Sequence, residues 1–304
     1  MIDKSPLAMI NLYICASNKI ERNMLVLPIT RIKIGIAKML YKIVKLFFPQ
    51  TIRTITRHGI HYEVDLSEGI DLSLFLFGNF QSHVTQNKYL SIKPDDVIID
   101  VGGNFGIMAL QFAKAASKGM IYSFEPTHYA LSKFNRNLDL NPDLKQRIVL
   151  INSFVSETSS DEAKITAFSS WKVSGKESAE EHKHPVHLGT AKSTQGVGSV
   201  SLDDFMLSYS LQKVDIIKID TDGHEFMVFN GARKMIETLR PKIIFEVGQY
   251  VMEEKGIDFS FYLNYFSSMN YSLFDTESGK NISANNALKV IPKLGTIDII
   301  ALPK

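Results

Sequence analysis

The sequence contains one cysteine, Cys15, and therefore cannot form an intrachain disulfide. So few thiols are typical of a protein that works in a reducing compartment, and we expect a cytoplasmic location. Net charge is also scarce, because 34 basic and 32 acidic side chains leave a formal charge of +2. Such a balance gives no support for a nucleic-acid partner or for any other strongly charged partner.

Long apolar runs are missing as well. No run reaches the roughly 18 residues that a membrane-spanning helix needs. The run LAMINLYICA at 7–16 has the length of a signal-peptide core, but Asp3 and Lys4 cancel and leave no positively charged region before it. We therefore expect neither a spanning helix nor a signal peptide.

The first 50 residues differ in character from the rest, and we expect a helical extension at 1–50 followed by one domain at 51–304. The segment 31–48, RIKIGIAKMLYKIVKLFF, mixes basic and apolar residues at helical spacing. Two interpretations remain open: a helix docked on the domain or on a second subunit, and a helix lying on an anionic membrane surface. The basic side chains that share one narrow arc of this helix are Arg31, Lys38, Lys42 and Lys45.

From residue 52 on, short apolar runs alternate with segments of helical periodicity. A hairpin is expected at 52–66, turning near His58 and Gly59, with a helix at 71–91. The later apolar runs are rich in Ile and Val, as in parallel strands covered on both faces, and predict a doubly wound α/β sheet. Strands are expected at 97–101, 120–125, 147–155, 164–168, 214–220, 242–247 and 295–303, and helices at 105–116, 128–140 and 225–239.

The stretch VIIDVGGNFG at 97–106 runs from an apolar strand into a glycine-rich turn, at the end of the strand where such sheets bind ligands. Its spacing does not supply the dinucleotide fingerprint G-x-G-x-x-G, and the lysine of a phosphate loop is missing. Glu125 ends the next apolar strand, where a carboxylate can accept both hydroxyls of a ribose. A glycine turn and an acid, in the absence of a phosphate-binding motif, favour a nucleoside without phosphate, such as S-adenosylmethionine.

Five motifs follow one another within a cofactor core of about 95–250: DVIIDVGGNFG, YSFEP, SLDDF, VDIIKIDTDGHE and RPKIIFEVG. In this order they resemble the FkbM family of S-adenosylmethionine-dependent methyltransferases. The usual family motifs are D-V-G-A-N-x-G and K-x-D-V-E-G-x-E, so Gly103 replaces an alanine and Asp222 a glutamate. Gln81, which ends GNFQ, stands where that family element usually has glutamate. The resemblance implies a class I, Rossmann-like methyltransferase sheet whose last strand is antiparallel.

The resemblance also implies the cofactor contacts. One group of residues is expected around the amino-acid end of the cofactor, one residue on its ribose and one near its adenine. In that order these are Asp100, Gly102, Asn104 and Gly106; Glu125; and Ser153.

Methyl transfer to a hydroxyl requires in-line positioning and is helped by a base or a metal ion. The segment KIDTDGHE offers Asp220, Asp222 and His224 as catalytic candidates. Asp220 and Asp222, together with Glu246 at the end of the next strand, also suit Mg²⁺. Two other interpretations stay open: Asp222 and Glu225 cap the following helix, and His224 is an exposed residue of its first turn.

The polar stretch 169–198 interrupts the alternation of strands and helices, and a structureless loop of that length is either functional or disordered. We expect it to act as a lid over the acceptor, with Phe168 and Trp171 facing the acceptor or packing in the core. Ser201 and Asp204 are expected to cap a helix start. The histidines of HKHPVH, which we expect to be solvated, are His182, His184 and His187.

The sequence thus predicts an S-adenosylmethionine-dependent O-methyltransferase that acts on a hydroxyl of a small molecule, a glycan or a lipid-linked sugar. Two alternatives remain. One is a module of the same fold that binds the cofactor without catalysis, which the departures at Gln81 and Asp222 motivate. The other is an NAD-dependent oxidoreductase, against which the glycine spacing argues. No pattern in the sequence identifies the acceptor or the oligomeric state.

Overall fold

The computed structural model describes residues 30–304 except 164, 166, 170–171, 174–189 and 294. The described residues divide into two compact units, and Phe80 is the last residue of the first before the chain enters the second at Gln81. Lys172, Val173 and Thr190 also belong to the first unit. The domain boundary predicted near residue 50 falls inside this unit.

The first unit contains an antiparallel hairpin, as predicted. Strand β1 (Ile52–Arg57) pairs with β2 (Ile60–Asp65), and Arg57 lies opposite Ile60. The two turn residues between them have positive φ angles, 50° at His58 and 72° at Gly59. Positive φ at both positions is the type I′ geometry that matches the twist of a hairpin.

The predicted N-terminal helix is present as α2 (Thr30–Phe47), which packs on α3 (Gly69–Phe77) of the same unit. Tyr41 and Val44 are buried on that side of α2, so docking on the neighbouring helix is confirmed for this face. The single helix predicted for 71–91 is wrong. Helix α3 ends at Phe77, because Gly78 adopts a left-handed conformation with φ 76°. The short helix α4 (Ser82–Thr85) then follows.

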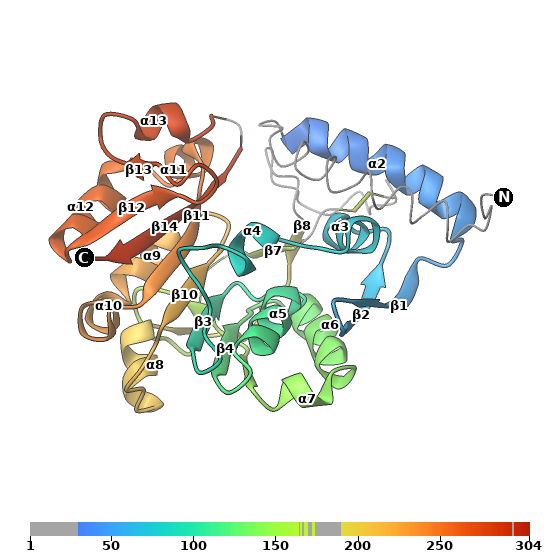
Figure 1. The fold of residues 1–304 in the computed structure, drawn as a ribbon, viewed down its shortest axis with the longest axis horizontal. Helices are drawn as coiled ribbons and strands as arrows, with labels where there is room; N and C mark the ends of the chain where they lie inside the picture. Colours follow the sequence, from blue (N-terminus) through green and yellow to red (C-terminus); the bar gives the residue numbers. More distant parts are fainter. Residues whose placement is uncertain (1–29, 164, 166, 170–171, 174–189, 294) are drawn as a thin grey trace. The chain divides into compact units, whose positions relative to one another are not determined.

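The second unit is built on one mixed sheet, whose strands are labelled in Figure 1 from β13 and β12 at one edge as far as β4, which lies next to the other edge strand, β5. Its order in the described chain is β13-β12-β14-β11-β10-β3-β4-β5. Five strands are parallel: β3 (Val97–Val101), β4 (Met120–Phe124), β5 (Ile148–Ile151), β10 (Ile216–Ile219) and β11 (Lys242–Val247). The late strand β14 (Ile297–Pro303) is antiparallel to β11 and to β12 (Tyr271–Asp275), and β13 (Asn281–Ile282) borders β12. The doubly wound α/β sheet with an antiparallel last strand is therefore confirmed.

Helices connect and cover these strands. They are α5 (Ile107–Ala115), α6 (His128–Asp139), α7 (Pro142–Lys145), α8 (Leu202–Ser208), α9 (Glu225–Asn230), α10 (Arg233–Leu239), α11 (Gln249–Glu254), α12 (Ser260–Ser268) and α13 (Ala287–Val290). Two short strand pairs are separate from the main sheet: β6 (Phe154–Val155) with β9 (Ser199–Val200), and β7 (Ala167–Ser169) with β8 (Thr190–Lys192).

Two predicted elements are each split in two. The strand expected at 147–155 breaks between β5 and β6, where the Ser153 N–H donates to the Ile151 carbonyl and turns the chain toward β9. The helix expected at 225–239 breaks between α9 and α10 at Gly231. A Cβ at Gly231 would lie 2.1 Å from the Ser156 carbonyl oxygen, so close backbone approach decides the break.

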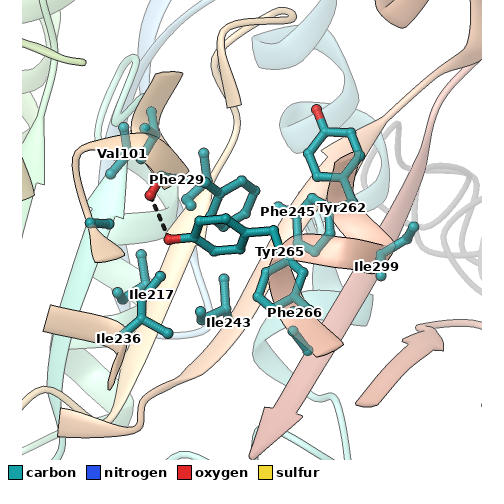
Figure 2. Packing of buried hydrophobic residues seen from close by; sticks show 14 of the residues in the cluster. Val101, Ile217, Phe229, Ile236, Ile243, Phe245, Tyr262, Tyr265, Phe266 and Ile299 are labelled. Atoms are coloured by element: carbon teal, nitrogen blue, oxygen red, sulfur yellow. Dashed lines mark hydrogen bonds between the residues drawn. The ribbon is translucent and has the colours of Figure 1, made fainter. Parts of the chain in front are cut away.

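Aromatic side chains fill the core between the sheet and helices α9 and α12 (Figure 2). The Phe229 ring meets Phe245 edge to face at 5.0 Å, and Phe245 stacks on Phe266 at 5.4 Å. The Tyr265 hydroxyl donates to the Phe229 carbonyl, which leaves no polar atom of that ring unpaired. Such ring pairs contribute about 0.5–1.5 kcal/mol each beyond their burial, and here they fix α9 and α12 against β11.

Several predictions from the sequence fall outside the described residues. These are the apolar run at 7–16 with Cys15, the residue Trp171, the histidines 182, 184 and 187, and most of the proposed lid at 169–198. Phe168 lies in β7, where only the backbone is described. Over the described ranges, no helix combines the length and the hydropathy needed to span a bilayer.

Candidate active site

Four charged residues of the sheet, Asp100, Lys218, Glu246 and Asp298, lie on one face near the carboxyl ends of the parallel strands. Asp100 and Lys218 are paired in register between β3 and β10, and therefore point to the same face. Lys218 is also paired with Ile244, two residues before Glu246, which is paired with Asp298 of β14. The period of two thus brings two acid-containing pairs to the face opposite the aromatic core.

The glycine turn after β3 needs its glycines for two different reasons. Gly102 has φ 83°, and a Cβ there would lie 1.9 Å from the carbonyl oxygen of Asp220. Gly106 has φ 80°, and a Cβ would lie 2.2 Å from the Phe134 ring. Only glycine allows both the left-handed conformation and these approaches. The turn is consequently held against the end of β10.

Glu125 fastens the other side of the same turn. Its Oε2 accepts from the Asn104 N–H at 2.8 Å, and its Oε1 accepts from the Thr127 N–H at 2.8 Å and hydroxyl at 2.6 Å. Burial raises the pKa of this carboxyl group, although these donors oppose the shift. Oε2 keeps capacity for one more donor, and Asn104 Oδ1 is buried without a hydrogen-bond partner in the described chain.

Lys218 is a buried cation between two carboxylates. Its Nζ lies 3.3 Å from Asp100 Oδ1 and 3.5 Å from Asp220 Oδ2, and it donates to the Gly102 carbonyl at 3.1 Å. Burial by itself would lower the pKa of the ammonium group, but Asp100 and Asp220 outweigh that effect and raise it. Lys218 therefore stays charged and ties the glycine turn to the end of β10.

Ser123 occupies the space beside Gly103. Its hydroxyl donates to Asp100 Oδ2 at 2.8 Å, and a Cβ at Gly103 would lie 2.2 Å from Ser123 Oγ. The alanine that is usual at this position in the glycine motif therefore does not fit beside this serine. Gly103 and Ser123 form a matched pair that holds the buried Asp100.

Gly103→Ala is expected to lower the free energy of unfolding by about 1–3 kcal/mol, because the added methyl overpacks against Ser123. Adding Ser123→Ala should recover most of that loss. About 1 kcal/mol should remain, because Asp100 loses the serine hydrogen bond. Urea denaturation of the two single variants and the double variant measures the coupling. Losses that simply add would contradict this pairing.

Asp220 and Asp298 each receive a partner from the segment around α4. Gln81 donates its Nε2 to Asp220 Oδ2 at 3.2 Å, from a left-handed backbone with φ 49°. His83 pairs through Nε2 with Asp298, and this pairing raises the pKa of the imidazole against the opposing effect of burial. Gln81 Oε1 and His83 Nδ1 are buried, and in the described chain neither has a hydrogen-bond partner.

Two further carboxyl groups, those of Glu246 and Asp222, interact electrostatically with Asp220. Desolvation, followed by repulsion from Asp220 and Asp298, raises the pKa of Glu246 well above its ordinary value. Desolvation and Asp220 also raise the pKa of Asp222, but this side chain is exposed, so solvent screens the repulsion and reduces the shift. Burial and the neighbouring carboxylates therefore favour the protonated form of Glu246, which can donate a hydrogen bond.

Glu246→Gln is expected to raise the melting temperature by roughly 2–4 °C at pH 8, about 1 kcal/mol. A folded-state pKa above the usual 4.5 means that stability is lost as pH rises from that value through the raised pKa. Glutamine cannot ionise, and it keeps an oxygen for the Thr296 hydroxyl, which donates to Glu246 Oε1 at 2.6 Å.

Thermal melts across pH test this expectation, with the exposed Glu253→Gln of α11 as the control. The gain should vanish below pH 4, where both states bind the proton. A gain of equal size at all pH values would contradict the charge argument.

His224 has hydrogen bonds on both ring nitrogens. Nδ1 lies 3.2 Å from the Thr221 carbonyl and must donate to it, so the Nε2 lone pair accepts from Lys255 Nζ at 3.2 Å. Burial and the Lys255 charge lower the pKa of this imidazole. The ring is held neutral, with its only lone pair engaged, and this favours a carboxylate over His224 as a base.

Other candidates have structural partners. Glu225 accepts from the Thr221 N–H and hydroxyl and from the Gly223 N–H, so it fastens the loop before α9. Ser201 accepts from the Asp204 N–H, which confirms the predicted helix cap for Ser201, whereas the Asp204 carboxylate accepts from the Ser159 hydroxyl instead of the Ser201 N–H. The Ser153 hydroxyl donates to backbone carbonyls of Phe154 and Gly198.

Magnesium finds no support at the predicted ligands Asp220, Asp222 and Glu246. Among the described residues, no three His, Cys, Asp or Glu side chains converge as a metal site requires. The site instead combines the partly exposed carboxylate of Asp220 with a glycine turn whose hydrogen-bond acceptors include Glu125 Oε2 and Asn104 Oδ1.

Sequence reasoning missed four contributors to this site. Lys218 and Asp298 had a signal, since each is a charged residue inside an apolar strand. Ser123 and His83 had no such signal, because their partners are distant in the sequence. His83 and Asp298, for example, are 215 residues apart.

Comparisons with known proteins identify similarity to methyltransferases. A family model described as the methyltransferase FkbM domain matches residues 100–273, more than half of the chain. The hexuronic acid methyltransferase AglP of Haloferax volcanii is 23% identical over 152 residues, which cover 50% of this chain and 56% of that protein. The 2-O-methyltransferase NoeI of Sinorhizobium fredii is 27% identical over 159 residues, covering 49% and 62%. The match thus spans less than two thirds of either relative.

Solved structures overlap in part. A methyltransferase FkbM from Methylobacillus flagellatus superposes with a TM-score of 0.42 at 16% identity, covering 69% of this chain and 44% of that one. TYW2 of M. jannaschii in complex with AdoMet gives 0.39 at 12% identity, covering 83% and 85%.

Proposed function

Because the chain belongs to the FkbM methyltransferase family, we propose that it is an S-adenosylmethionine-dependent O-methyltransferase. Its acceptor is a hydroxyl of a small molecule, a glycan or a lipid-linked sugar, and it works in the cytoplasm. One observation carries the proposal. The glycine turn that would hold the cofactor lies directly against Asp220, since a Cβ at Gly102 would fall 1.9 Å from the Asp220 carbonyl oxygen.

The polar atoms of the turn fit the cofactor. Its ribose hydroxyls and its ammonium group are hydrogen-bond donors, and the turn offers acceptors to match them. Among the described residues, Glu125 Oε2 accepts one hydrogen bond, from the Asn104 N–H, and Asn104 Oδ1 is a buried acceptor with no partner. We propose that Glu125 binds the ribose, Asn104 the amino-acid end, and the segment at Ser153 the adenine.

When bound, S-adenosylmethionine supplies a methyl group on a positively charged sulfonium. The protein has to orient the acceptor hydroxyl in line with that group and to remove its proton. Asp220 is the base in this proposal, because its carboxylate is 27% exposed and is oriented by Gln81 and Lys218. His224 contributes no base, since its lone pair accepts from Lys255.

The electrostatics of the site favour a neutral acceptor. Asp220 and Asp222 are like charges, and Asp298 is already paired with His83. An acceptor with a carboxylate next to its reacting hydroxyl would be repelled by Asp220. A neutral hydroxyl, in contrast, can donate to Asp220 and accept from a protonated Glu246.

Calorimetric titration with S-adenosylhomocysteine tests the cofactor assignment, and transfer of labelled methyl groups to pooled glycans and small alcohols tests the reaction. Micromolar binding together with labelled product is the expected result. Binding without transfer to any acceptor would favour a module that retains the cofactor but not catalysis. Absence of binding would overturn the proposal.

A further inference from the structure

Helix α2 presents three different strips along its length. Tyr41 and Val44 are buried on α3. At about 100° per residue, the exposed Lys38, Lys42 and Lys45 occupy the next strip. Beyond the lysines lies a fully apolar strip. Its exposed side chains are Met39 (56%), Ile43 (47%), Leu46 (80%) and Phe47 (68%).

Four large apolar side chains on one helix face are more than the single exposed residues that proteins usually tolerate. They recur at helical spacing and lie on the side of α2 away from the packed face, so packing within this unit does not explain them. Ile52, just after the helix, is exposed by 62% and adds to the same apolar segment. The strip therefore fits an apolar environment outside the protein.

The basic residues beside the apolar strip indicate which apolar environment it fits. The segment TRIKIGIAKMLYKIVKLF has several basic residues and no acidic one. Lysine is depleted at the centre of protein interfaces, whereas long lysine stems at a membrane surface lie along apolar groups while the ammonium reaches the lipid headgroups. A helix with this pattern lies in the plane of an anionic bilayer surface.

We propose that α2 is a membrane-docking helix, which inserts Met39, Ile43, Leu46 and Phe47 among anionic lipids while Lys38, Lys42 and Lys45 contact their headgroups. The inference does not depend on the catalytic assignment. It also explains why the helix keeps an apolar face after docking on α3 with another.

Sedimentation of the full chain with vesicles tests the proposal. The vesicles consist either of phosphatidylcholine alone or of phosphatidylcholine mixed with phosphatidylserine. The intact chain should bind the mixed vesicles more tightly, and added salt should weaken this binding. Replacing Lys38, Lys42 and Lys45 with glutamine should weaken it about a hundredfold, roughly fivefold for each lysine.

Two further variants separate the causes. Leu46→Glu with Phe47→Glu should abolish sedimentation with both kinds of vesicle, while thermal melting shows that the variant is folded. The matched charge control replaces the exposed Lys118, Lys289 and Lys304 with glutamine, and should bind like the intact chain.

The proposal is overturned if the intact chain fails to sediment with anionic vesicles, or if the Leu46 and Phe47 variant sediments as well as the intact chain. A weakening by the control lysines equal to that of the α2 lysines would also overturn it. Light scattering tests whether a second copy of the chain, rather than a membrane, covers the apolar strip. A dimer of the intact chain that is lost in the Leu46 and Phe47 variant would assign the strip to that second copy.

Discussion

Replacing Glu125 with alanine should weaken S-adenosylhomocysteine binding by about 10²- to 10³-fold, or roughly 3–4 kcal/mol. The carboxylate, only 6% exposed, does two things at once. It accepts the backbone N–H groups of Asn104 and Thr127, and in the proposed function it also accepts a ribose hydroxyl of the cofactor. Alanine leaves both amides without their acceptor, at about 1–3 kcal/mol each, and removes the ribose contact.

The titration described above measures this loss, and thermal melting in parallel measures the cost to the fold. The exposed Glu157→Ala is the matched control, because it removes an acid from the segment just after β6 without touching the turn. A folded Glu125→Ala variant that binds the nucleoside as tightly as the intact chain would show that the end of β4 does not contact the ribose.

Asp220→Asn should lower kcat by about 10²- to 10⁴-fold, the range that a positioned general base contributes. Asparagine keeps the shape and can still bond to Gln81, but it cannot take up the proton of the acceptor hydroxyl. Single-turnover methyl transfer with an acceptor from the labelled screen separates this chemical step from binding. S-adenosylhomocysteine affinity should change by less than tenfold.

His224→Ala is the informative comparison for Asp220→Asn. Because the imidazole is bonded to Thr221 and Lys255, its removal should reduce kcat by less than tenfold. A larger loss of kcat in His224→Ala than in Asp220→Asn would indicate that His224, and not Asp220, is the base. Equal losses near tenfold would mean that acceptor binding, rather than proton removal, limits the reaction.

The parts of the fold and of the site that the sequence predicts well are local in the chain. Apolar runs identify the parallel strands, and the glycines after Asp100 predict a turn that needs positive φ, as at Gly102 and Gly106. Such signals depend on neighbouring residues only. They therefore hold whichever tertiary contacts the strand later makes.

Elements decided by distant contacts were predicted poorly. Gly231 separates α9 from α10 because the Ser156 carbonyl approaches it, and nothing near residue 231 announces that approach. The apolar pattern at 71–91 resembles one helix, yet the chain has positive φ at Gly78 and Gln81, and Gln81 then reaches Asp220, 139 residues away. Side chains that meet only in the folded sheet leave no periodic signal in the sequence.

The place of β14 in the sheet has a consequence for the order in which the protein can be assembled during synthesis. The strand is made after β12 and β13, yet it lies between β11 and β12 and pairs with both. Until it emerges, the β12–β13 hairpin has no hydrogen-bonded route to the parallel strands. The parallel half of the nascent sheet then ends at β11 as an open edge, which can pair with other chains. Emergence of β14 closes that edge and, in the same step, brings Asp298 to the carboxyl group of Glu246. The candidate active site and the sheet are therefore completed together.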